Sequence, residues 1–225
     1  MSLLLLCFSN YGQIKSGVVT YGVTVVEDKE SQIDKLMLSM NVNYYSIIKE
    51  FDFTLKFCSD KALFSETEKM YSDAEASNLG KVKINYLGRY LIKNDTIYSE
   101  GTSRSIGNYI SKKKVITDWI LLNETKLIGN YKCYKATYDD IVVNKINTFR
   151  HPIIAWYCPE IPFPFGPLGY GGLPGLILEL QTKNGVYGAR KIQLNSDEIS
   201  IENLKAYRVL EIEKLNELIE KKNSN

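Results

Sequence analysis

Short runs of alternating apolar and polar residues dominate the chain, and β-branched and aromatic residues are concentrated in them. Such runs are typical of half-buried β-strands. From residue 83 to residue 114 they recur at close intervals, which indicates a meander of antiparallel strands. Strands are expected in particular over residues 17–27, 51–58, 61–68, 115–122, 131–138, 148–158, 176–182 and 186–194.

Turn signals and helical spacing complete the predicted elements. Asn94-Asp95 and residues 183–185 (Lys-Asn-Gly) each lie between two β-rich runs, and both predict hairpins because these residues tolerate the left-handed backbone of tight turns. Apolar residues recur at helical spacing over residues 30–50 and 202–222, which predicts two helices. Residues 70–80 are polar and are predicted to be a loop.

These elements amount to about ten strands and two helices, without regular strand–helix alternation. We therefore predict an α+β, mostly β fold: a large curved antiparallel sheet, half-barrel-like, with one helix in the N-terminal half and one C-terminal helix. The apolar run near the start predicts that residues 1–13 are the remnant of a signal peptide, followed by a single β-rich domain over residues 14–225. No segment has the length of a transmembrane helix.

The composition argues against several kinds of function. With 28 Lys and Arg against 26 Asp and Glu, the net charge of +2 is too balanced for a nucleic-acid-binding protein. A single histidine, His151, excludes a multi-histidine metal centre, and the adjacent Asp139 and Asp140 are ordinary turn residues that only weakly indicate calcium. The basic run at residues 112–114 is typical of a solvated turn or edge strand. We predict no metal and no cofactor.

Catalysis by a nucleophile finds little support in the sequence. A Cys158–His151 dyad would need both side chains on one face of a strand, but residues seven apart lie on opposite faces unless a bulge at Pro152 intervenes. We predict no catalytic residue and no enzyme, and keep a hydrolase or thiol enzyme as the weakest alternative. A disulfide between Cys133 and Cys158 stays open, although a turn over residues 139–147 would place Cys133 opposite residues 153–155.

The most distinctive segment is WYCPEIPFPFGPLGYGGLPGLIL, residues 156–178, and five of the six prolines lie between Pro159 and Pro174. Proline stiffens the backbone and glycine permits tight turns, so residues 159–175 are predicted to form a rigid, irregular loop. Its apolar side chains either plug one end of the sheet core or form a binding surface, and the plug is favoured because exposed apolar area promotes aggregation. The residues predicted to line or close a site are Trp156, Tyr157, Phe163, Phe165, Tyr170 and Leu173.

The sequence also resembles a known family. The hexapeptide Gly172-Leu173-Pro174-Gly175-Leu176-Ile177 resembles the signature of the GLPGLI family of secreted Bacteroidetes proteins, and residues 117–137 and 155–167 resemble its N-E-T-K, C-x-K-A and A-W…P-E-I-P motifs. Two features depart from that pattern: Cys158, where a small residue such as Thr is expected, and a longer link over residues 139–154. The resemblance implies export to the periplasm or outer membrane, or secretion, and brings no activity and no catalytic residue.

We therefore expect an exported envelope protein that binds or carries a hydrophobic ligand, a lipid or a polypeptide without catalysis. The alternative is an interaction or assembly module that docks an outer-membrane partner through the loop of residues 159–175. An apolar cavity beside the loop would favour the first function, and a flat exposed apolar patch would favour the second. The expected partner is thus a hydrophobic ligand or an envelope protein, while the oligomeric state stays open.

Overall fold

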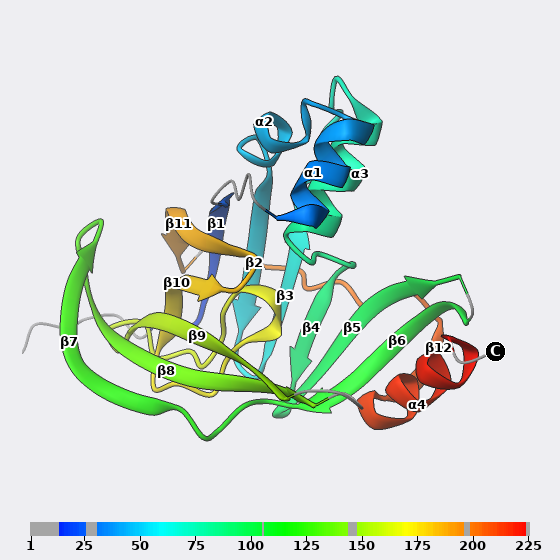
Figure 1. Ribbon diagram of the computed structural model, residues 1–225. Coiled ribbons are helices and arrows are strands. Elements are labelled where there is room, and N and C mark those ends of the chain that lie inside the picture. Colours follow the sequence, from blue (N-terminus) through cyan, green and yellow to red (C-terminus); the bar gives the residue numbers. More distant parts are fainter. Residues whose placement is uncertain (1–13, 26–30, 105, 144–147, 196–198, 224–225) are drawn as a thin grey trace, which may run out of the picture.

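The computed structural model describes residues 14–25, 31–104, 106–143, 148–195 and 199–223, so the predicted signal-peptide remnant lies outside the described residues. Within these ranges twelve strands form one open sheet in the order β12-β6-β5-β4-β3-β2-β1-β11-β10-β9-β8-β7 (Figure 1). The strands are β1 (Ser16–Thr24), β2 (Asp52–Cys58), β3 (Lys61–Glu66), β4 (Tyr90–Lys93), β5 (Thr96–Ser103), β6 (Gly107–Lys114), β7 (Ile120–Ile128), β8 (Tyr131–Val143), β9 (Thr148–Cys158), β10 (Leu176–Thr182), β11 (Gly185–Leu194) and β12 (Arg208–Glu211). The helices are α1 (Gln32–Met40), α2 (Tyr44–Ile48), α3 (Ala74–Lys83), α4 (Ile212–Asn223) and the short 3-10 helix η1 (Pro167–Gly169).

The mostly β fold with one large open sheet confirms the predicted fold class. One edge differs from the prediction, because β12 pairs with β6 in parallel and makes the sheet mixed. The helix expected over residues 202–222 begins only at Ile212. Residues 208–211 instead extend the sheet, and Leu210 packs with Tyr109 and Leu215 in a small separate core. Pairing to a sheet edge here overrides the local helical pattern.

The helix predicted over residues 30–50 is divided into α1 and α2. Asn41 leaves the helical conformation with φ −155°, and its side-chain oxygen accepts a hydrogen bond of 2.9 Å from the N–H of Asn43. An asparagine side chain that competes for backbone hydrogen bonds in this way is a common cause of a helix end.

The loop predicted over residues 70–80 is wrong, because α3 occupies most of it. The helix begins after Asp73, whose carboxylate accepts a hydrogen bond of 2.9 Å from the N–H of Ala76. Its buried face consists of small residues, among them Gly80, against which Ile48 and Phe51 pack closely. A face of small residues leaves no apolar stripe in the sequence, so the helical spacing was invisible there.

Both predicted hairpins are confirmed. Asn94 and Asp95 have positive φ values of 48° and 57° between the paired residues Lys93 and Thr96, as a two-residue turn of the kind that joins twisted strands requires. Between β10 and β11, Thr182 pairs with Gly185, so the turn consists of residues 183 and 184.

The register of β8 and β9 differs from the prediction. The two strands extend to residues 143 and 148, so Asp139 and Asp140 lie within β8 and not in a turn. Tyr134 pairs with Tyr157, and the next residues outward, Cys133 and Cys158, therefore oppose each other. The expectation that Cys133 faces residues 153–155 is wrong, because it assumed a longer turn than the one that forms.

The sheet curves around the proline-rich loop, and Figure 1 shows the segment between β9 and β10 inside this curve. The rings of Phe57 on β2 and Phe163 in the loop lie 4.7 Å apart between centroids. The 3-10 helix η1, which belongs to the loop, contacts β3, β4 and β5. The loop thus fills the concave side of the sheet, and the edges of this filled region are where clefts can form.

Candidate functional site

Most of the apolar loop residues predicted for the site are buried. Phe163, Phe165 and Leu173 are 7%, 3% and 2% exposed, and Tyr157 is buried as well. Tyr170 and Trp156 are partly exposed. The favoured plug interpretation agrees with this placement, since the phenyl rings face the protein's own core.

The loop backbone makes its own hydrogen bonds, which is how so irregular a segment can lie in a core. The N–H of Ile177 donates to the carbonyl of Phe165 at 2.9 Å, and the N–H of Gly172 donates to that of Pro164 at 3.0 Å. Two side chains add hydrogen bonds here: Trp119 Nε1 donates to the Gly171 carbonyl in the loop at 2.9 Å, and the buried Tyr21 hydroxyl donates to the carbonyl of Ile177, at the start of β10, at 2.6 Å.

The Trp119 contact leads to a testable prediction. Trp119→Phe keeps an aromatic ring beside Tyr138 and Tyr170 but removes the donor to the Gly171 carbonyl. We expect the free energy of unfolding to fall by about 1 kcal/mol, the usual net value of one hydrogen bond. Urea unfolding followed by circular dichroism measures this. A loss near zero would show that this bond does not hold the loop.

A cleft of about 420 Å³ opens where the loop lies between strands β4 and β6 on one side and strands β8 and β9 on the other. We call it the Tyr170 cleft. It is large enough for a small ligand, since such sites usually occupy roughly 300–1,000 Å³. Its walls come from the loop, from β4, β6, β8 and β9, and from the β10–β11 turn. The lining residues are Ile84, Asn85, Tyr90, Lys113, Asp140, His151, Ile153, Leu168, Tyr170, Thr182, Lys183 and Asn184.

Four polar side chains of this cleft are not paired within the described part of the chain, whereas the Thr182 hydroxyl hydrogen-bonds to the Gly185 carbonyl. In that part, no hydrogen bond or ion pair involves the hydroxyls of Tyr90 and Tyr170 or the ammonium groups of Lys113 and Lys183. Burial raises the pKa of both phenols, that of Tyr90 to about 12, and Asp140 adds to the effect on Tyr170. Both phenols are therefore neutral hydrogen-bond donors at neutral pH.

Lys113 is the cleft lysine on which Asp140 acts electrostatically. The residue as a whole is exposed, but desolvation of its ammonium group lowers its pKa, an effect that Asp140 partly opposes. Asp140 is paired across β8 and β9 with His151, so these two side chains share one face of the sheet. The histidine ring also stacks on Phe149 at 6.3 Å between centroids.

The remaining predicted site residues lie elsewhere. Trp156 is flanked by two lysines, with the ammonium of Lys126 at 4.4 Å from its ring centroid and that of Lys135 at 6.0 Å. These are cation–π contacts on the β7–β9 surface. His151 and Cys158 are seven residues apart along β9, about 23 Å at the usual rise of a strand. The β8–β9 register runs past Pro152 without a shift, so the bulge that a dyad would need is not formed on that side.

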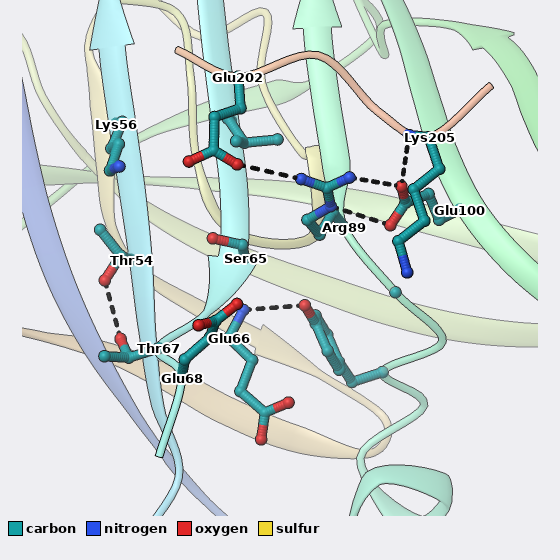
Figure 2. A pocket seen from close by; sticks show the side chains of 13 residues that line it. Thr54, Lys56, Ser65, Glu66, Thr67, Glu68, Arg89, Glu100, Glu202 and Lys205 are labelled. Carbon is teal, nitrogen blue, oxygen red and sulfur yellow. Dashed lines mark hydrogen bonds and ion pairs between the residues drawn. The ribbon is translucent and has the colours of Figure 1, made fainter. Parts of the chain in front are cut away.

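A second and larger cleft of about 610 Å³ lies on the outer face of β2 and β3, and we call it the Arg89 cleft (Figure 2). Its main charges compensate one another. The Arg89 guanidinium donates to both carboxylate oxygens of Glu100 at 2.8 and 3.0 Å and to Glu202 at 3.4 Å. The backbone N–H of Lys205 also donates to Glu100 at 2.9 Å. Figure 2 shows this network at the segment that carries Glu202 and Lys205.

The two clefts differ in what they offer a ligand. In the Arg89 cleft, Arg89 contacts Glu202 and Glu100 accepts from the Lys205 N–H, so this pair fastens residues 202–205 to the sheet, which is a structural use of charge. In the Tyr170 cleft two phenols and two ammonium groups surround an apolar floor and have no partner in the described ranges. The Tyr170 cleft is therefore the candidate functional site.

Two other features are absent from the described residues. No three His, Cys, Asp or Glu side chains gather there as metal ligands would. No helix in the same ranges is both long and apolar enough to cross a membrane.

Comparisons with known proteins find a family match over the loop and a similar fold in solved structures. A family model described as a protein of unknown function, Porph_ging, matches residues 139–179, the segment that includes β9, the loop and part of β10. No curated protein sequence matches the chain. Solved structures of PNGF-II in space groups P21 and C2 are similar to it, with TM-scores of 0.53 and 0.52 and 15% identity over 92% of this chain. The chain spans about a third of the PNGF-II length, 33%, and the likeness shows the fold alone.

Proposed function

We propose that this is an exported binding protein and that the Tyr170 cleft takes the anionic end of a ligand whose remaining part is apolar. The observation that carries the proposal is the set of unpaired donors, two phenols and two ammonium groups, around one apolar floor. Export rests on the resemblance of the loop and its flanking motifs to secreted proteins.

The donors fit an anion. Lys113 and Lys183 bring two positive charges against the single carboxylate of Asp140, so the cleft carries excess positive charge. The hydroxyls of Tyr90 and Tyr170 add neutral donors, and a carboxylate, sulfonate or phosphate oxygen accepts bonds from both kinds of group. Partial desolvation of Lys113 makes a bond from its ammonium stronger than the same bond in water.

The floor fits an apolar body. Ile84 and Ile153 are buried beneath the cleft, and Leu168 from the loop forms another wall. Leu168 has a positive φ of 55°, a conformation that is rare for a residue of its size. Such backbone strain is often found at ligand sites, and here it sets Leu168 beside Tyr170 at the cleft.

Binding through the cleft is better supported than the two alternatives. A docking module needs exposed loop rings, but Phe163 and Phe165 pack inside the sheet. A thiol enzyme needs Cys158 close to His151, and most of β9 separates them.

Octanoate and octanol test the proposal because they share a tail and differ in charge. Isothermal titration should show octanoate binding at least about tenfold more tightly than octanol, since a charge-assisted hydrogen bond contributes about 1.5–3 kcal/mol. Lys113→Gln should weaken octanoate about tenfold and leave octanol unchanged.

Lys114→Gln is the matched control, because Lys114 is the next residue on β6, is exposed and does not line the cleft. It should bind octanoate as the unaltered chain does. Equal affinity for the two ligands, equal loss in both lysine variants, or no octanoate binding at millimolar concentration would contradict the proposal.

A further inference from the structure

Two buried cysteines face each other at the point where the plug loop leaves the sheet. Cys133 on β8 and Cys158 on β9 are both fully buried. The register of the strands places them directly opposite one another, one residue beyond the pair Tyr134 and Tyr157. Opposed residues of antiparallel strands have Cα atoms roughly 4.5–5.5 Å apart, within the range of about 4.4–6.8 Å that a disulfide spans.

The side chains point toward each other as well. Each thiol shifts the pKa of the other through side-chain interaction, which requires the two sulfur atoms to lie close together, and Cys133 Sγ also lies 3.7 Å from the Tyr131 carbonyl oxygen. Buried free cysteines often serve only as small apolar residues. A pair of thiols in contact across two strands differs from that case, because a bond can form between them without moving the backbone.

We propose that Cys133 and Cys158 form a disulfide, a covalent link between β8 and the start of the plug loop, and that Cys58 takes no part in it. Cys58 lies on β2 and pairs with Ser16 and Lys61, away from both other cysteines. The link would hold Cys158, the residue that precedes Pro159. The Cys158 carbonyl also accepts a hydrogen bond of 3.2 Å from the N–H of Ile161.

The chemistry is a thiol–disulfide exchange with a small external disulfide such as oxidised glutathione. The Cys158 thiol releases its proton, and the thiolate attacks one sulfur of the reagent, whose S–S bond breaks and releases one glutathione thiolate. The Cys133 thiolate then attacks the Cys158 sulfur of the mixed disulfide, so that the Cys133–Cys158 bond forms and the second glutathione leaves. The two cysteines lose two electrons and two protons, and one oxidised glutathione becomes two reduced molecules.

The surroundings favour Cys158 as the attacking residue. The hydrogen bond from Cys133 lowers the pKa of Cys158, burial opposes this, and the backbone N–H groups of Glu160 and Ile161 add to the lowering. The pKa of Cys133 is raised by the same hydrogen bond and by burial. Thiolate, and not thiol, is the nucleophile in such exchanges.

The experiment counts free thiols in the full chain. Reduced protein is equilibrated with oxidised glutathione until the count is constant, quenched with acid, unfolded and alkylated, and the added groups are counted by intact mass. Of the four cysteines in the sequence, four should be alkylated before oxidation and two afterwards. Peptide mapping should join Cys133 to Cys158. In Cys58→Ser the same pair should still form.

Stability supplies a second measurement. The oxidised chain should unfold at a higher urea concentration than the reduced chain, because the link restricts the unfolded state. Cys133→Ser, which cannot form the link, should show equal midpoints under both conditions. Four alkylated cysteines after oxidation, a bond that includes Cys58, or mixed disulfides with glutathione on both cysteines would overturn the proposal.

Discussion

Phe163→Ala is expected to lower the free energy of unfolding by about 3–5 kcal/mol, the range for removing a buried phenyl ring. The Phe163 ring contacts Phe57 on β2 and lies 6.3 Å from the ring of Phe165 between centroids, so its loss leaves a cavity between loop and sheet. The double variant with Phe165→Ala should lose most of the roughly 5–15 kcal/mol that stabilises an ordinary domain. Urea unfolding followed by circular dichroism measures both losses.

Phe149→Ala is the matched control. Phe149 lies in the β8–β9 hairpin, is 42% exposed and stacks on His151, so we expect a loss of less than about 1 kcal/mol. If Phe163→Ala and Phe149→Ala cost the same, the loop rings would not form part of the core. The docking-module interpretation would then regain its basis.

Gly172→Ala is expected to cost about 3 kcal/mol or more. Gly172 has φ +81°, which by itself costs an L-residue roughly 1–2 kcal/mol. A Cβ here would also lie against the backbone carbonyl oxygen of Ile116, and overpacking of this kind costs roughly 1–3 kcal/mol. Thermal and urea unfolding of the purified variant measure the loss.

Gly129→Ala separates the two contributions. Gly129, in the β7–β8 turn, has a positive φ of 58°, but a Cβ there meets no atom within 4 Å. We expect about 1–2 kcal/mol from backbone strain alone. Equal losses in the two variants would mean that close packing against Ile116 contributes nothing and that the loop can shift to make room.

Phe163→Ala and Gly172→Ala concern the feature that was easiest to recognise in the sequence. Five prolines within residues 159–174, mixed with glycines and aromatic residues, indicated a stiff loop that avoids water. Proline and glycine act through the local backbone, so their meaning can be understood without knowing the neighbours. The burial of Phe163 and Phe165 agrees with this interpretation.

Only part of the candidate site could be predicted from the sequence. Tyr170 is among the predicted site residues, whereas Lys113 belongs to the basic run of residues 112–114, Asp140 to a predicted turn, and His151 is considered only as a metal ligand or as the partner of Cys158. Asp140 and His151 lie 27 or more positions from Lys113 along the chain, and no local pattern connects the three residues. Tyr90 and Lys183 gave no indication of a binding site, because a tyrosine in a strand and a lysine in a turn are ordinary there.

The sequence by itself determined the mostly β fold, both tight hairpins and the irregular proline-rich loop, because alternation and turn chemistry act over a few neighbouring residues. The tertiary structure alone decided the β8–β9 register, which brings Cys133 opposite Cys158, and the helix α3, whose buried face is made of small residues. It also decided the Tyr170 cleft, whose polar residues come from strands that meet only when the sheet curves around the loop. Which distant segments meet depends on the packing of the whole chain, and charged or hydroxyl-bearing residues on a strand carry no mark of the partner they will face.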